Sequence, residues 1–139
     1  MKETLQKNKL NSVLLVDDNE FDLLVAEKTL ARKTNVKTIH RFTKPAGALA
    51  LLRNINRNSR QFPEFILLDV KMPVINAFGF LEKAEQLGGF TASSCRVVLI
   101  SSYLNYFEGP EIMEKAKNHS CIAGFIEKPF TIEKLAELA

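Results

Sequence analysis

The chain has 139 residues, of which 46% are hydrophobic and 25% charged, with a formal net charge of +3. This length and balance are typical of one globular domain that buries a core without disulfides or structural metals. No apolar run approaches the roughly 20 residues that a membrane-spanning helix needs, and the lysine-containing start has no signal-peptide core. We therefore expect a cytoplasmic protein without membrane contact. The basic group Arg53, Arg57 and Arg60 lacks interleaved aromatic residues, so DNA binding by this chain is not expected.

Short apolar runs alternate with amphipathic segments along the chain. We expect a loose tail over residues 1–11 and one folded domain over residues 12–139, whose last helix could be cut short at Ala139. The expected strands are 12–16, 36–40, the apolar run that ends at Asp69, 96–101 and 121–126. The expected helices are 21–32, one that starts at the 43–45 turn, 76–87, one entered at Pro110, and one capped by Thr131.

This alternation, without hairpin signals, predicts an α/β domain. Its parallel five-stranded sheet is doubly wound, with helices on both faces. Right-handed crossovers then bring the carboxyl ends of all the strands to one edge. Ligand chemistry in open α/β sheets lies at that edge.

Acidic, hydroxyl and amino side chains follow the strand ends. Asp17 and Asp18 follow the first strand, Asp69 ends the third, Ser101 ends the fourth and Lys128 follows the fifth. Three carboxylates brought together repel one another unless a cation neutralises them, and an oxygen-only set selects a hard ion such as Mg²⁺. A hydroxyl and an ammonium opposite that ion suit an incoming phosphoryl group. The edge is therefore predicted to accept a phosphoryl group on a carboxylate.

The sequence resembles the receiver domain of two-component response regulators from about Ser12 to Ala139. The matching pieces, in chain order, are Asp17-Asp18-Asn19, Asp69 with Met72-Pro73, Ser101, and Lys128-Pro129-Phe130. The resemblance implies a flavodoxin-like (βα)5 sheet with strand order 2-1-3-4-5. It also implies a phosphorylation-dependent switch, which is not a turnover enzyme but has at most slow autophosphorylation and self-dephosphorylation.

The resemblance further implies roles for individual residues. Asp69 would take the phosphoryl group from a histidine kinase, a histidine phosphotransfer protein or a small phosphodonor. Mg²⁺, or Mn²⁺, would be bound by Asp69, directly by Asp18, largely through water by Asp17, and by the backbone carbonyl of Lys71. An unknown downstream protein would read the result.

Three residues near the last two strands complete the implied switch. Ser101 would hydrogen-bond a phosphoryl oxygen, and Lys128 would pair first with the carboxylate and later with the phosphoryl group. Phe125 would turn inward as the hydroxyl moves, changing the partner-binding face of the fourth and fifth strands and the helices after them; the alternative is that Phe125 is simply a core residue. A cis Lys128–Pro129 bond is also expected.

Two stretches depart from the family pattern. Asn76-Ala77 stands where many receivers have an acidic residue and a glycine. Because alanine disfavours the positive φ that glycine allows, we expect the loop beside Asp69 to follow a different course from that of those receivers. The stretch between Ser101 and Lys128 is longer than usual. Its extra residues fall in the loop with Tyr103, Tyr106 and Phe107, which either contacts a partner or packs on the domain.

Other functions remain as alternatives. A flavin-binding electron carrier of similar architecture needs small residues and free amides after the first strand, whereas the acidic run 17–20 would repel a flavin phosphate. An aspartate-based, Mg²⁺-dependent phosphohydrolase normally has its two acids two residues apart, and here they are adjacent. Cys95 and Cys121 could be neighbours, but a disulfide is not expected in a reducing compartment.

Overall fold

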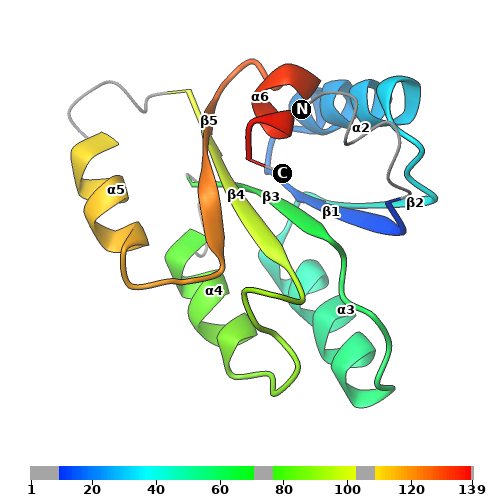
Figure 1. Cartoon of the computed structure of the whole chain (residues 1–139), viewed down its shortest axis with the longest axis vertical. Coiled ribbons are helices and arrows are strands. Elements are labelled where there is room, and N and C mark those ends of the chain that lie inside the picture. Colours follow the sequence, from blue (N-terminus) through cyan, green and yellow to red (C-terminus); the bar gives the residue numbers. More distant parts are fainter. Residues whose placement is uncertain (1–9, 71–76, 103–108, 139) are drawn as a thin grey trace.

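The computed structural model describes residues 10–70, 77–102 and 109–138. Within these residues, five parallel strands form one sheet in the order β2-β1-β3-β4-β5, which confirms the predicted topology (Figure 1). The strands are β1 (Ser12–Val16), β2 (Thr38–Phe42), β3 (Phe65–Asp69), β4 (Arg96–Ser101) and β5 (Ile122–Glu127). The predicted tail residues 1–9 lie outside the described part of the chain.

Helices cover both faces of the sheet. They are α2 (Glu20–Lys33), α3 (Pro45–Arg57), α4 (Ala77–Glu85), α5 (Gly109–Ala116) and α6 (Ile132–Ala136). Helices α3, α4 and α5 pack on one face, and α2 and α6 pack on the other (Figure 1). Among the described helices, none combines the length and apolar character needed to cross a membrane.

The alternation of side chains along each strand creates two cores. In β1, Val13 and Leu15 belong to the core under α2 and α6, whereas Leu14 and Val16 belong to the core under α3, α4 and α5. Successive side chains of a strand point to opposite faces, and both faces are covered here, so nearly every residue of β1 and β3 must be apolar. These strands therefore read as continuous apolar runs that stop at an aspartate.

The second strand lies two residues later than predicted. The sequence favoured residues 36–40, but β2 spans Thr38–Phe42 and pairs with β1 from Ser12↔Thr38 to Val16↔Phe42. This strand is at the edge of the sheet, and its residues are only partly buried or exposed. A strand with so little buried apolar surface carries a weak pattern, so its register comes from pairing with β1.

The packed part of the chain begins before β1. Leu10 is buried, and the Asn11 backbone N–H donates to Glu64 Oε1 at 2.7 Å. The same carboxylate oxygen accepts the Ser12 N–H at 3.0 Å. Glu64 therefore holds the start of β1 beside the start of β3, at the edge of the sheet opposite the strand ends considered next.

Candidate functional site

The carboxyl ends of four strands converge on one edge of the sheet. Asp17 directly follows β1, Asp69 is the last residue of β3 and Ser101 is the last residue of β4. The pairing sets Asp69 opposite Ile100 and Ser101 opposite Glu127, so Lys128 emerges beside them. Asp17, Asp69 and Ser101 are all buried polar residues, with Ser101 only 1% exposed. The fold thus brings together the residues that the strand-end pattern singled out.

Three carboxylates form a compact group at this edge. One oxygen each from Asp17, Asp18 and Asp69 lies within 4.8 Å of the others. Asp17 and Asp69 are buried whereas Asp18 is exposed, so the group opens to solvent on the Asp18 side. Carboxylate oxygens so arranged, with room for water, fit a hard divalent ion such as Mg²⁺ better than a metal that needs nitrogen or sulfur ligands.

The ammonium of Lys128 lies among the carboxylates. Its Nζ is 3.0 Å from Asp17 Oδ2 and 3.9 Å from Asp69 Oδ1. Only 19% of the lysine side chain is exposed, so its positive charge acts in a partly desolvated environment. The lysine therefore offsets part of the negative charge that the aspartates concentrate here.

Burial and pairing shift the pKa values of this group. Burial raises the pKa of Asp17 above its ordinary value, although the Asn19 N–H and Lys128 oppose the shift. Burial alone would lower the pKa of Lys128, but hydrogen bonds to Asp22 and Asp17 and the charges of Asp69 and Asp17 outweigh it and raise that pKa. Lys128 is thus fully protonated at neutral pH.

Backbone contacts fix where Lys128 begins. Its N–H donates to the Ser101 carbonyl at 2.9 Å, which extends the pairing of β4 with β5 by one residue. The Lys128–Pro129 peptide bond is cis, as predicted. The end of β4 therefore holds the Lys128 backbone beside that of the buried Ser101.

Of the other residues that the sequence analysis singled out, the structure describes Phe125 but not Lys71. Phe125 lies in β5 opposite Leu99, is partly buried, and packs against the core under α3, α4 and α5. Lys71, whose carbonyl was expected to bind the metal, lies outside the described residues, as do Asn76, Tyr103, Tyr106 and Phe107. The expected difference beside Asp69 therefore stays a prediction.

The sequence did not point to Asp22, which makes the shortest recorded contact with Lys128. Lys128 Nζ donates to Asp22 Oδ2 at 2.7 Å. Asp22 lies in the first turn of α2 and not at a strand end. An acidic residue at a helix start is common because it suits the helix dipole, so this position gave no separate signal of a role in the site.

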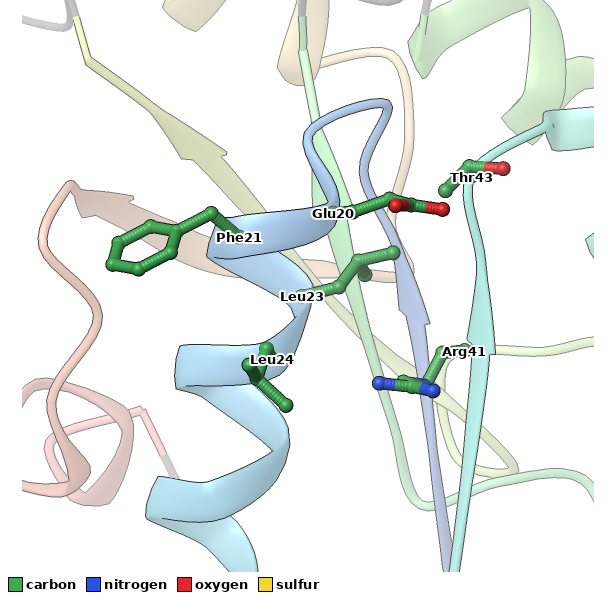
Figure 2. A pocket seen from close by; sticks show the side chains of 6 residues that line it. All are labelled: Glu20, Phe21, Leu23, Leu24, Arg41 and Thr43. Atoms are coloured by element: carbon green, nitrogen blue, oxygen red, sulfur yellow. The ribbon is translucent and has the colours of Figure 1, made fainter.

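A pocket near the start of α2 is separate from the carboxylate group. It lies between α2 and the end of β2, and its lining residues are Glu20, Phe21, Leu23, Leu24, Arg41 and Thr43 (Figure 2). In this view Glu20 points toward Thr43, whereas the Phe21 ring points away, to the other side of the helix. Phe21 is 72% exposed. The pocket contains none of the clustered aspartates and is not the site that the strand ends build.

Comparison with known proteins gives limited sequence matches. No protein-family model matches the chain. Over 71 residues the chain is 37% identical to protein-glutamate methylesterase/protein-glutamine glutaminase 2 from Hahella chejuensis (strain KCTC 2396). That alignment covers 51% of this chain and 18% of the relative, so the chain spans less than a fifth of the relative's length.

Comparison with solved structures gives matches over almost the whole chain. A two component response regulator from Cytophaga hutchinsonii is 26% identical with a TM-score of 0.81, over 94% of this chain and 95% of that one. A response regulator receiver protein from Dyadobacter fermentans DSM 18053 is 29% identical with a TM-score of 0.75, over 94% of each chain. Both matches are long enough to include every strand whose end contributes to the site.

Proposed function

Because the chain resembles response regulator receiver domains in fold and in sequence, we propose that it is a phosphoacceptor switch of a two-component phosphorelay, with Asp69 as the acceptor. The observation that carries this proposal is the group formed by the Asp17, Asp18 and Asp69 oxygens, with the Lys128 ammonium 3.9 Å from Asp69. A buried carboxylate flanked by a potential metal site and a cation is suited to attack phosphorus. Receiver domains are phosphorylated by histidine kinases, which makes a phosphohistidine the proposed donor.

The proposed reaction is a single phosphoryl transfer. An Asp69 carboxylate oxygen forms a bond to phosphorus as the phosphorus–nitrogen bond of phosphohistidine breaks, and the departing imidazole leaves with its electron pair and takes a proton from water. The product is an acyl phosphate on Asp69. Lys128 neutralises charge on the phosphoryl oxygens, and the Ser101 hydroxyl donates a hydrogen bond to one of them.

The carboxylate group would hold a divalent cation during this transfer. Asp17, Asp18 and Asp69 supply the side-chain oxygens, and we assign the backbone carbonyl of Lys71 as a further ligand. Bound Mg²⁺ or Mn²⁺ supplies positive charge to the transferred phosphoryl oxygens. Burial raises the pKa of Asp17, so without a bound cation this carboxyl takes up a proton at a higher pH than an exposed aspartate does.

We assign the output of the switch to β4, β5 and the helices next to them. Ser101 ends β4, and Phe125 lies on the neighbouring strand β5. Movement of the Ser101 hydroxyl toward a phosphoryl group frees space that Phe125 can enter from its partly buried position. The face next to α5 would then change its affinity for a downstream protein.

The experiment is phosphorylation by acetyl phosphate with Mg²⁺, followed by intact-mass analysis. One phosphoryl group is expected on the wild type, with none after chelation of Mg²⁺ and none in Asp69→Asn. Glu82→Gln is a matched control because Glu82 is an exposed acid on α4, away from the strand ends, and this variant should be labelled like the wild type.

Two results would contradict the assignment. Labelling of Asp69→Asn at the wild-type rate would show that another residue is the acceptor. A wild-type protein that neither acetyl phosphate nor a phosphorylated histidine kinase can label would contradict the proposed switch function. A yellow purified protein would support the flavin carrier, and sustained phosphate release from monoesters would support the phosphohydrolase.

A further inference from the structure

Lys128 has a closer partner than the proposed phosphoacceptor. Its Nζ lies 2.7 Å from Asp22 and 3.0 Å from Asp17, but 3.9 Å from Asp69. The distance to Asp69 is too long for a hydrogen bond, whereas the other two are within hydrogen-bond range. The lysine that is needed at the phosphoryl group is thus held on the α2 side of the site.

The helix cap at the start of α2 holds the backbone of Asp22. Asn19 caps the helix by accepting the Asp22 N–H at 3.0 Å through Oδ1. The Asn19 N–H in turn donates to Asp17 Oδ1 at 2.9 Å. Asn19 therefore holds the Asp17 carboxylate through its N–H and the Asp22 backbone through its side chain, so both acids that contact the ammonium are tied to the same helix cap.

We propose that Asp22 is a positioning residue that holds Lys128 away from Asp69 and must release it when Asp69 is phosphorylated. This inference rests on the proposed function. The phosphorylated site needs the Lys128 ammonium on a phosphoryl oxygen, so Asp22 competes with the phosphoryl group for one cation. Asp22 thereby shortens the lifetime of the phosphorylated state. In the unphosphorylated state it keeps the Lys128 ammonium away from Asp69.

Asp22 is exposed enough to lose its contact with Lys128 at low cost. Its side chain is 34% exposed, compared with 12% for Asp17 and 7% for Asp69. Once the lysine leaves, water can solvate the Asp22 carboxylate, whereas the more buried Asp17 would lose more by being abandoned. Of these two hydrogen-bonding partners, Asp22 is therefore the one that Lys128 gives up more easily.

The test compares Asp22→Asn with Glu20→Gln. Both residues are acidic and lie in the first turn of α2, so each variant loses one favourable interaction with the helix dipole. Side chains two residues apart on a helix lie about 200° apart around the axis, and Glu20 points toward Thr43 (Figure 2). The control therefore removes the same charge from the other side of the helix.

The measurement is the affinity for beryllofluoride, a phosphoryl mimic, at saturating Mg²⁺ by titration calorimetry. Asp22→Asn is expected to bind it about threefold to tenfold more tightly than the wild type, the size expected for releasing one partly exposed ion pair. Glu20→Gln should stay within about twofold of the wild type, since exposed charges at this distance are screened. Acyl phosphate decay should slow in Asp22→Asn by a similar factor.

A spectroscopic readout separates positioning from a structural role. The ¹⁵Nζ resonance of Lys128, assigned with Lys128→Arg, should move in Mg²⁺-free Asp22→Asn toward its position in the beryllofluoride complex of the wild type. An unchanged resonance together with unchanged affinity would overturn the proposal, as would equal effects of Asp22→Asn and Glu20→Gln. A wild type that neither binds beryllofluoride nor is labelled by acetyl phosphate would overturn the proposed function itself.

Discussion

At the scale of single residues, Lys128 is the centre of the site's electrostatics. It is the cation that the structure records beside Asp17, Asp22 and Asp69, and its raised pKa shows that pairing outweighs burial. A lysine whose folded pKa is above its unfolded value contributes stability that is complete below about pH 10.5 and is lost only as the pH rises through the folded pKa. At neutral pH the contribution is therefore fully present.

Replacing Lys128 by methionine should reveal this contribution. The free energy of unfolding at pH 7 without divalent cations should fall by about 1–3 kcal/mol, because buried carboxylates would be left without a compensating charge. Lys117→Met is the control: Lys117 pairs with Glu114 at 3.0 Å, but both side chains are over 70% exposed, at 73% and 74%. That pair should be worth less than about 0.5 kcal/mol. Equal losses in urea denaturation would contradict the argument.

At the scale of elements, α6 braces the segment that carries Lys128. This helix has only five residues, of which Ile132, Leu135 and Ala136 are buried. Lys134 Nζ donates to the carbonyls of Glu127 at 2.9 Å and Pro129 at 3.0 Å. The helix thus contacts the backbone on both sides of Lys128, and its own stability affects where the lysine is held.

Removing the N-terminal cap of α6 should therefore lower the stability of the protein. The Thr131 hydroxyl accepts the Lys134 N–H at 3.2 Å, as the sequence predicted from a threonine before the last helix. Thr131→Ala should lower the free energy of unfolding by about 1 kcal/mol, whereas Thr131→Ser should retain most of it because serine keeps the acceptor oxygen. Urea denaturation of the three proteins gives the comparison. If alanine and serine behave alike, the hydroxyl does not cap the helix.

The elements differ in how well the sequence predicts them. The bounds of β1 and β4 match residue for residue because buried strands are continuous apolar runs, whereas the edge strand β2 is displaced by two residues because it buries little. The strand-end pattern likewise placed Asp17, Asp18, Asp69, Ser101 and Lys128 at one edge, where the structure has them, and their roles stay predictions. Asp22 could not be predicted in this way, because its contact with Lys128 spans 106 positions and depends on how α2 sits against the sheet.

At the scale of the whole molecule, the site and the two cysteines lie at opposite ends of the strands. The aspartates lie at the carboxyl ends of the strands, whereas Cys95 and Cys121 precede β4 and β5 at the amino ends. Both cysteines are free and buried in the core under α3, α4 and α5. A thiol reagent therefore reports on opening of the core, and a ligand at the strand ends can affect that opening only by stabilising the native state.

This separation predicts slow and equal labelling of the two thiols. Burial, with a smaller effect from the charge of Glu85, raises the pKa of Cys121 to about 11, and burial also raises the pKa of Cys95. In the folded protein, both cysteines are therefore almost entirely in the unreactive thiol form at pH 8. Both cysteines should react with a disulfide reagent only through global opening, and Mg²⁺ with beryllofluoride should slow both by the same factor, because a ligand of the native state lowers the population of open molecules. The urea-unfolded protein, which should react fast, is the control, and peptide mass analysis separates the two sites. Rapid labelling of Cys121 alone would mean that the α4–β5 side opens locally, and the core would then not respond to the site as one unit.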